Sequence, residues 1–212
     1  MNGTGGTEKA RQRTVFSSVR DVPSPAVRLP EGLALNARQR MDGLAMMRLL
    51  PDRCVTAAFF DPQYRGILDK LNYGNEGIKR GKARCAQRQM PEDTIRRFIR
   101  EIDRVLIPNG HLFLWMDKFH VCTGFAHWFQ DTALQTVDMI TWNKRRMGMG
   151  YRTRRTCEYL VVLQRPPGRA KGVWKAHNIP DVWEEKVQTE GGAHCKPVGL
   201  QAELIETVSN PG

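Results

Sequence analysis

Several features that would indicate a membrane, secreted or metal-binding protein are missing from this sequence. No apolar run approaches the roughly 18 to 20 residues that a helix needs to span a bilayer, and the opening residues, MNGTGGTEK, lack the apolar core of a signal peptide. The five cysteines are odd in number, widely spaced and without a CxxC pair, which argues against a disulfide framework or a zinc site. We therefore expect a reduced, cytoplasmic protein.

Acidic residues are scarce relative to basic ones. The chain holds 22 Asp and Glu against 33 Lys and Arg, a formal net charge of +11. A basic surplus of this size favours a polyanionic partner, because each phosphate that a protein neutralises releases counterions. Composition alone leaves equally open a basic protein that binds no such partner. The hydrophobic fraction of 41% in 212 residues is enough for one domain with its own core.

The pattern along the chain predicts a polar arm followed by one α/β domain. Residues 1–28 are rich in Gly, Ser, Thr, Pro and charge, which predicts a flexible N-terminal arm, and residues 29–212 form the domain. Short apolar runs predict buried strands, and amphipathic stretches predict helices between them, as in a sheet covered by helices. The expected strands span 55–60, 111–116, 137–142 and 158–163, and the expected helices span 44–50, 91–106, 118–132 and 196–208.

The sharpest motif is FFDPQYR, residues 59–65, at the end of the first predicted strand. In open α/β sheets, ligands bind beyond the carboxyl ends of the strands. An exocyclic amino group of a base is a poor nucleophile because its lone pair is delocalised into the ring. The Asp61 carboxylate and the Pro62 carbonyl can accept its two N–H bonds and restore nucleophilicity, while Tyr64 can stack on a base flipped out of a duplex. An ordinary Asp-Pro turn is the alternative interpretation.

The segment DPQY, residues 61–64, resembles the Asp-Pro-Pro-Tyr catalytic motif of DNA methyltransferases that modify exocyclic amino groups. Further segments resemble that family's other motifs in the order of its permuted β group, where the catalytic half precedes the cofactor half. The resemblance extends over roughly residues 36–212. The matching segments are 41–52, 101–112, 142–144, 154–159, 194–200 and 209–212.

This resemblance implies a Rossmann-like S-adenosylmethionine-dependent methyltransferase fold, with S-adenosylmethionine as the cofactor. It implies double-stranded DNA as the substrate, site-specific methylation at adenine N6, and a role in restriction-modification. Asp at the first motif position is usual for adenine, and N4 of cytosine stays an alternative. The implied catalytic residues are Asp61, Pro62, Gln63 and Tyr64, and the implied cofactor pocket is lined by Asp42, Phe60, Asp61, His194, Lys196 and Pro197.

Two departures from the family's pattern bear on these expectations. Gln63 replaces the usual second proline, and the sequence stops at SNPG, residues 209–212, before the glycine-rich cofactor loop. We therefore expect either a fold cut before that loop or a protein that lacks half of the usual cofactor site. A catalytically inactive remnant that binds DNA, and an RNA methyltransferase, are alternative functions; the permuted order favours DNA. Members of the group often dimerise, which leaves a homodimer open, but the sequence shows no clear interface for one.

Lys196 is unusual at the start of a predicted helix, where cations are disfavoured. A functional contact would account for it, and so would a solvated side chain. The irregular segment 166–192 carries Trp174 and Trp183, and it is the candidate target-recognition region. Core packing of the two tryptophans is the alternative.

Two acid-free basic segments, residues 79–88 and 144–155, flank the proposed site and are predicted to contact DNA. A solvated charged face is the alternative for any such run, and the arginines next to Glu158 can instead pair with it. The predicted DNA-binding residues are Arg65, Lys79, Arg80, Lys82, Lys144, Arg145, Arg146, Arg152, Arg154 and Arg155.

Overall fold

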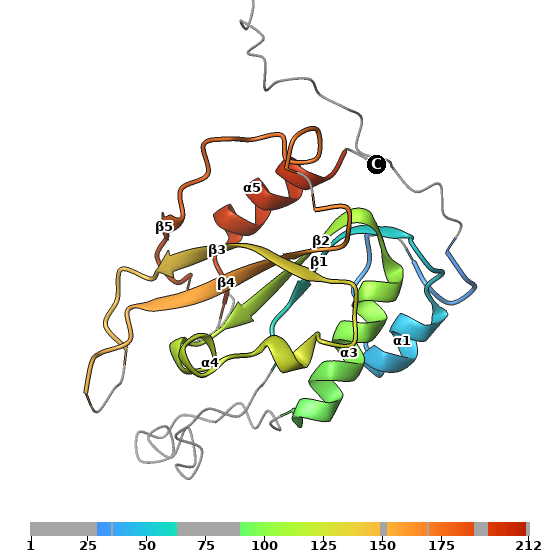
Figure 1. Cartoon of the computed structure of the whole chain (residues 1–212), viewed down its shortest axis with the longest axis horizontal. Helices are drawn as coiled ribbons and strands as arrows, with labels where there is room; N and C mark the ends of the chain where they lie inside the picture. Colours follow the sequence, from blue (N-terminus) through green and yellow to red (C-terminus); the bar gives the residue numbers. More distant parts are fainter. Residues whose placement is uncertain are drawn as a thin grey trace, which may run out of the picture.

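Five strands form one mixed sheet in the computed structural model, which describes residues 29–34, 36–62, 90–148, 152–168, 170–188 and 195–210. The predicted arm, residues 1–28, lies outside the described residues. Strand β4 runs antiparallel to both of its neighbours, β2 and β3, while β1 pairs with β2 and β5 pairs with β3 in parallel. In spatial order the strands are β1 (Val55–Phe60), β2 (Leu106–Met116), β4 (Cys157–Gln164), β3 (Gln135–Asn143) and β5 (Val182–Glu184) (Figure 1).

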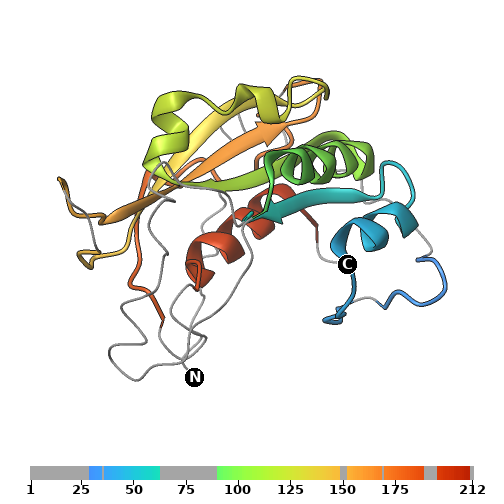
Figure 2. The same ribbon diagram turned by 90° about the horizontal axis from the view of Figure 1, so that it is seen from below.

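Helices cover both faces of this sheet (Figures 1 and 2). One face carries α1 (Gly43–Leu49) and α3 (Glu92–Val105), together with α4 (Lys118–Thr123) and the 3-10 turn η1 (Ala126–Trp128). The other face carries α5 (Val198–Val208). The predicted α/β class is therefore confirmed. No helix among the described residues has the length and apolarity to cross a membrane.

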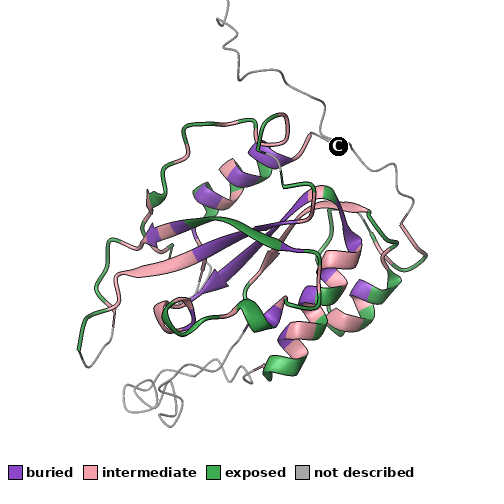
Figure 3. Ribbon diagram, viewed as in Figure 1, coloured by how far each residue is buried: buried purple, intermediate pink, exposed green. Residues whose placement is uncertain are grey.

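The central strands are buried on both faces, which explains their unbroken apolar runs (Figure 3). In β2, Leu112 and Leu114 face the core under α3, while Phe113 and Trp115 face the core under α5. Successive side chains of a strand point to opposite faces, so one apolar run supplies both cores.

Helix α3 agrees closely with the prediction for residues 91–106. Pro91 precedes its first turn, where Glu92 and Asp93 suit the positive end of the helix. Ile95 and Ile99 have no exposed surface, because the 3.6-residue period places them on one stripe.

The long helix predicted for residues 118–132 is wrong. Helix α4 ends at Thr123, where the Thr123 hydroxyl donates to the Phe119 carbonyl and Gly124 takes a φ of 94°. That left-handed conformation suits glycine and ends the helix. The chain continues as η1 rather than as α-helix.

Strand β2 also begins earlier than predicted, at Leu106 instead of residue 111. Its pairing with β1 shifts register between Val55 and Ala57, and Asn109 takes a φ of 66° in this irregular part. Gly110 lies there because an added Cβ would be 2.8 Å from the Ile107 carbonyl oxygen and 3.1 Å from that of Thr56.

Candidate active site

The carboxyl ends of β1, β2 and β3 and the amino end of β4 meet at one edge of the sheet. Register sets this arrangement: Phe60 pairs with Leu114, and Trp142 pairs with Glu158. Residues that follow β1 therefore lie beside the last residues of β2 and close to the start of β4. This is the edge where ligands bind in open α/β sheets.

Asp61 and Pro62 follow β1 directly at this edge. The Asp61 side chain is 47% exposed, so a ligand at the edge can reach its carboxylate. Pro62 is buried, and its ring fixes the backbone φ that aims its carbonyl. The other predicted residues of this motif and of the first basic segment lie outside the described residues, as does one predicted cofactor residue. They are Gln63, Tyr64, Arg65, Lys79, Arg80, Lys82 and His194.

Lys196 connects Asp61 to two further charged residues. Its Nζ lies 3.2 Å from Oδ1 of Asp61 and 2.8 Å from Oε2 of Glu158, and 5.1 Å from the ring centroid of Trp115. The other oxygen of Glu158, Oε1, is 3.1 Å from Nζ of Lys144. The four side chains Asp61, Lys196, Glu158 and Lys144 thus form a chain of alternating charge, called here the site network. Lys196 is only 19% exposed, so the solvated-lysine interpretation is wrong.

The site network keeps its inner members ionised. Burial alone would raise the pKa of Glu158, but Lys196 and Lys144 outweigh it and hold that pKa below its usual value. Burial alone would lower the pKa of Lys196, but Glu158 and Asp61 outweigh it and hold that pKa above its usual value. Both groups are therefore charged across the neutral range.

Helix α5, which begins just after Lys196, is held in place by Glu185. Its Oε1 accepts from the backbone N–H of Gly199 at 3.0 Å, and its Oε2 accepts from Leu200 at 3.2 Å and from the indole of Trp183 at 2.8 Å. The indole of Trp142 donates to the Glu185 carbonyl at 2.8 Å. A carboxylate suits this place because it satisfies unpaired helix N–H groups and the positive helix end.

The segment 166–192 packs against the sheet where it is described. Trp174 and Trp183 are partly buried against the core under α5, as the core-packing alternative predicted. Trp174 also meets His111 edge-on, with ring centroids 5.6 Å apart. Burial lowers the pKa of His111 to about 4, and its Nδ1 has no hydrogen-bond partner among the described residues. The recognition role of this segment stays a prediction.

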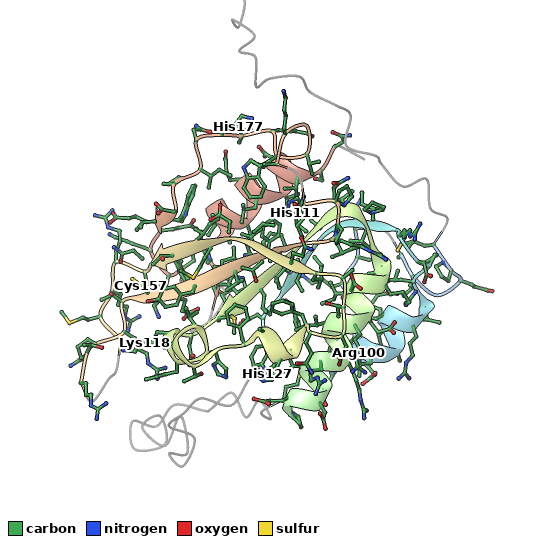
Figure 4. The ribbon with its side chains drawn as sticks, in the orientation of Figure 1. Arg100, His111, Lys118, His127, Cys157 and His177 are labelled. Carbon is green, nitrogen blue, oxygen red and sulfur yellow. The ribbon has the colours of Figure 1, made fainter. Side chains whose placement is uncertain are left out.

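The hairpin between β3 and β4 extends from the same edge and carries the second basic segment (Figure 4). Lys144, at its base, belongs to the site network and is 17% exposed. Arg155 is half-buried, and its guanidinium lies 5.2 Å from the ring centroid of Phe119. The remaining predicted DNA-binding residues of the hairpin are exposed: Arg145, Arg146, Arg152 and Arg154.

The sequence interpretation did not single out the start of α4 as part of this edge. Asp117 caps α4, and Lys118 Nζ donates to the Thr153 hydroxyl at 2.6 Å. Lys118 Nζ also lies 5.3 Å from the ring centroid of Phe119, the ring that Arg155 approaches. Lys118 lies just beyond the end of a buried strand, as Asp61 does. This position in the sequence could have identified Lys118 as a residue of the same edge.

Two residues predicted for the cofactor pocket lie on the α3 face. Asp42 is exposed and caps α1, accepting from the Ala45 backbone N–H at 2.8 Å. The ring of Phe60 packs on that of Phe98, with centroids 5.3 Å apart. A Cβ on Gly43 would come within 2.9 Å of the Phe98 ring, so the absent side chain lets the start of α1 approach this ring pair closely.

Comparisons with known proteins identify the family. No family model matches the chain. The chain is 52% identical to the type II methyltransferase M.HhaII of Haemophilus parahaemolyticus over 179 residues, 84% of this chain and 78% of that protein.

A solved structure shows the same fold. A protein of Thermus thermophilus assigned as a DNA modification methylase matches with a TM-score of 0.50 at 17% identity, over 80% of this chain and 73% of that one. Its complex with S-adenosyl-L-methionine matches with a TM-score of 0.49 at 16% identity, over 79% and 72%. On the strength of the M.HhaII match, the chain belongs to the type II DNA methyltransferases.

Proposed function

We propose that this chain transfers a methyl group from S-adenosylmethionine to the N6 amino group of adenine at a specific site in double-stranded DNA. The observation that supports this most directly is the half-exposed carboxylate of Asp61, followed by the buried Pro62, at the carboxyl end of β1. In this proposal the Asp61 carboxylate accepts one N–H bond of the target amino group and the Pro62 carbonyl accepts the other. Both bonds increase electron density on the attacking nitrogen.

Two side chains on the α3 face fit a cationic, amphipathic cofactor. S-adenosylmethionine supplies a methyl group on a sulfonium, which an aligned nucleophile displaces. Asp42 offers an exposed carboxylate, and Phe60 offers apolar surface close to the start of α1. We propose that Asp42, Phe60 and Pro197 help to hold the cofactor.

The methylated nitrogen gains positive charge and must lose a proton. The Asp61 carboxylate is close to that nitrogen in this proposal, and its exposure lets it release the proton to water. Asp61 therefore acts first as an acceptor of a hydrogen bond and then as an acceptor of the proton.

DNA is held, in this proposal, by the exposed arginines of the β3–β4 hairpin, which extends from the same edge as Asp61. Such side chains suit phosphate contacts. The target adenine leaves the duplex to reach Asp61, and segment 166–192 contributes to site recognition. We also propose that the protein belongs to a restriction-modification system in the cytoplasm. It is a homodimer in this proposal, and light scattering tests that oligomeric state.

Transfer of tritiated methyl from S-adenosylmethionine to unmethylated DNA tests the activity. Label in N6-methyladenine, lost in Asp61→Ala and retained in the control Asp138→Ala, is the expected result, because Asp138 is an exposed acid in the first half of β3, away from the carboxyl end of that strand. Label in N4-methylcytosine would instead show that the target base is cytosine. DNA binding without any label in the wild type would instead indicate an inactive, DNA-binding remnant.

A further inference from the structure

We propose that Lys196 is a positioning residue for methyl transfer: it orients the Asp61 carboxylate toward the target amino group, and Glu158 and Lys144 hold Lys196 in place. This inference rests on the proposed function and assigns Lys196 a task different from the cofactor contact that the family resemblance implies.

The contacts of the ammonium group support this role. A lysine ammonium has three N–H donors. Two of them face carboxylates, Asp61 at 3.2 Å and Glu158 at 2.8 Å, and the group lies 5.1 Å from the Trp115 ring, within range of a cation–π contact. Among the described residues, the contacts of this ammonium group are therefore with the two carboxylates and the Trp115 ring, which favours a role in holding Asp61.

The contact with Lys196 matters because of where Asp61 lies. It follows the last residue of β1, and its side chain is 47% exposed, so burial alone does not fix its rotamer. The ion pair with Lys196 fixes the direction of Oδ1. A carboxylate offers about four acceptor positions on two oxygens, so this pair is compatible with a further bond from the substrate.

Lys196 is itself held by residues of the sheet and of α5. Glu158 belongs to β4 and is 29% exposed, and Lys144 balances its second oxygen at 3.1 Å. Lys196 precedes the buried Pro197, which caps α5, and Glu185 fixes the first turn of that helix. The position of Asp61 is thus coupled through Lys196 to β4 and to α5. Misplacement of a reacting group by about 1 Å can lower a rate about 100-fold, so this coupling matters for catalysis.

The test compares Lys196→Met, which keeps the length of the side chain and removes its charge, with the wild type. The control is Arg104→Met. Arg104 also binds two carboxylates, Asp52 at 2.6 Å and Glu101 at 2.8 Å, but it lies at the end of α3 that leads into β2, at the edge of the sheet opposite to Asp61. Single-turnover methyl transfer, calorimetric binding of S-adenosylmethionine and thermal unfolding are measured for each protein.

We expect Lys196→Met to slow methyl transfer by about 10- to 100-fold while the Kd for S-adenosylmethionine stays within about twofold, because binding does not use the ammonium group. Lys196→Arg should restore part of the rate, since it restores the charge. Arg104→Met should lower the melting temperature, because it breaks the ion pairs with Asp52 and Glu101, and should leave the rate per folded molecule unchanged. A large rise in Kd with an unchanged rate at saturating cofactor would overturn the proposal and make Lys196 a cofactor ligand.

A double variant shows whether Lys196 acts through Asp61. Asp61→Asn keeps one oxygen acceptor and loses the ion pair, so adding Lys196→Met to it should slow transfer no further. If the double variant instead shows the product of the two single-variant rate reductions, Lys196 acts independently of Asp61. If Lys196→Met does not fold, Glu158→Gln gives the same comparison by removing the charge that anchors Lys196. Absence of transfer by the wild type would reject the proposed function itself, before any variant is compared.

Discussion

The carboxylate of Glu158 and the ammonium of Lys196 lie 2.8 Å apart although 38 positions separate them in sequence. The pair joins the start of β4 to the residues that lead into α5, and it is the centre of the site network. Because both side chains are largely removed from water, the pair is costly to break from one side only.

Removal of the Glu158 charge should lower stability at neutral pH. After Glu158→Gln, Asp61 is the only carboxylate paired with Lys196 among the described residues, and Lys144 loses its ion pair with Glu158. We expect a loss of about 1–3 kcal/mol in the free energy of unfolding, below the full cost of a buried unpaired charge because the side chains are partly exposed. Urea unfolding at pH 7 measures this loss, and an unchanged midpoint would contradict it.

The pH dependence of the same variant has a definite sign. The pKa of Glu158 is lower in the folded than in the unfolded protein, so its contribution to stability is present above its usual value of 4.5 and is lost as pH falls through the folded value. The stability advantage of the wild type over Glu158→Gln should therefore shrink as pH falls below about 4.5. Urea unfolding of both proteins from pH 3 to 7 checks this. An advantage that grows on acidification would show that the pair does not favour the ionised carboxylate.

Glu185 provides a second test, at the start of α5. Glu185→Ala removes the acceptor for Gly199, Leu200 and the Trp183 indole. We expect a loss of about 1–2 kcal/mol, as for other helix caps, together with slower methyl transfer, because the displaced helix start carries Lys196 with it. Glu206→Ala, an exposed residue of the same helix, is the control and should change neither quantity. Normal transfer by a destabilised Glu185→Ala would separate the cap from the active site.

Gly110 tests the tight pairing between β1 and β2. Gly110→Ala places a Cβ 2.8 Å and 3.1 Å from two backbone oxygens, which cannot move without disturbing both strands. Overpacking of this kind costs about 1–3 kcal/mol. Gly168→Ala is the matched control, because its nearest contact would be an ordinary 3.6 Å. Thermal unfolding of the two variants decides the point: equal melting temperatures would show that the strands relax around the added methyl group.

Helices and strands with strong local signals could be predicted from the sequence, and those without such signals could not. The strand at 55–60 was predicted with its observed bounds because a strand buried on both faces is a continuous apolar run, and α3 was predicted within one residue at each end because its stripe and first turn are local signals. The helix at 118–132 was overextended, since a conformation of Gly124 outweighed apolar spacing. Strand β5 was missed because three residues carry too little pattern.

The site was predicted in its position but not in its contacts. Asp61 and Pro62 could be predicted because they directly follow the apolar run of the strand at 55–60. The partners of Lys196 depend on how β1, β4 and α5 pack, so a local reading offered only a cofactor contact or a solvated side chain. Likewise, Glu158 was considered as a partner of nearby arginines, whereas its ion pairs with Lys144 and Lys196 are contacts of tertiary structure.

The structure separates two basic residues that the sequence placed in one DNA-binding segment, Lys144 and Arg146. Arg146 is exposed on the hairpin, so Arg146→Ala should weaken binding to all DNA sequences and reduce the slope of log affinity against log salt by about 1. Lys144 is paired with Glu158 at 3.1 Å, so Lys144→Ala should leave that slope nearly unchanged and lower stability instead. Arg48→Ala, on the exposed surface of α1, is the control for loss of a positive charge alone. Fluorescence anisotropy with labelled duplex DNA at several salt concentrations measures the slopes, and equal slope changes for Lys144→Ala and Arg146→Ala would mean that Lys144 leaves the site network to bind phosphate.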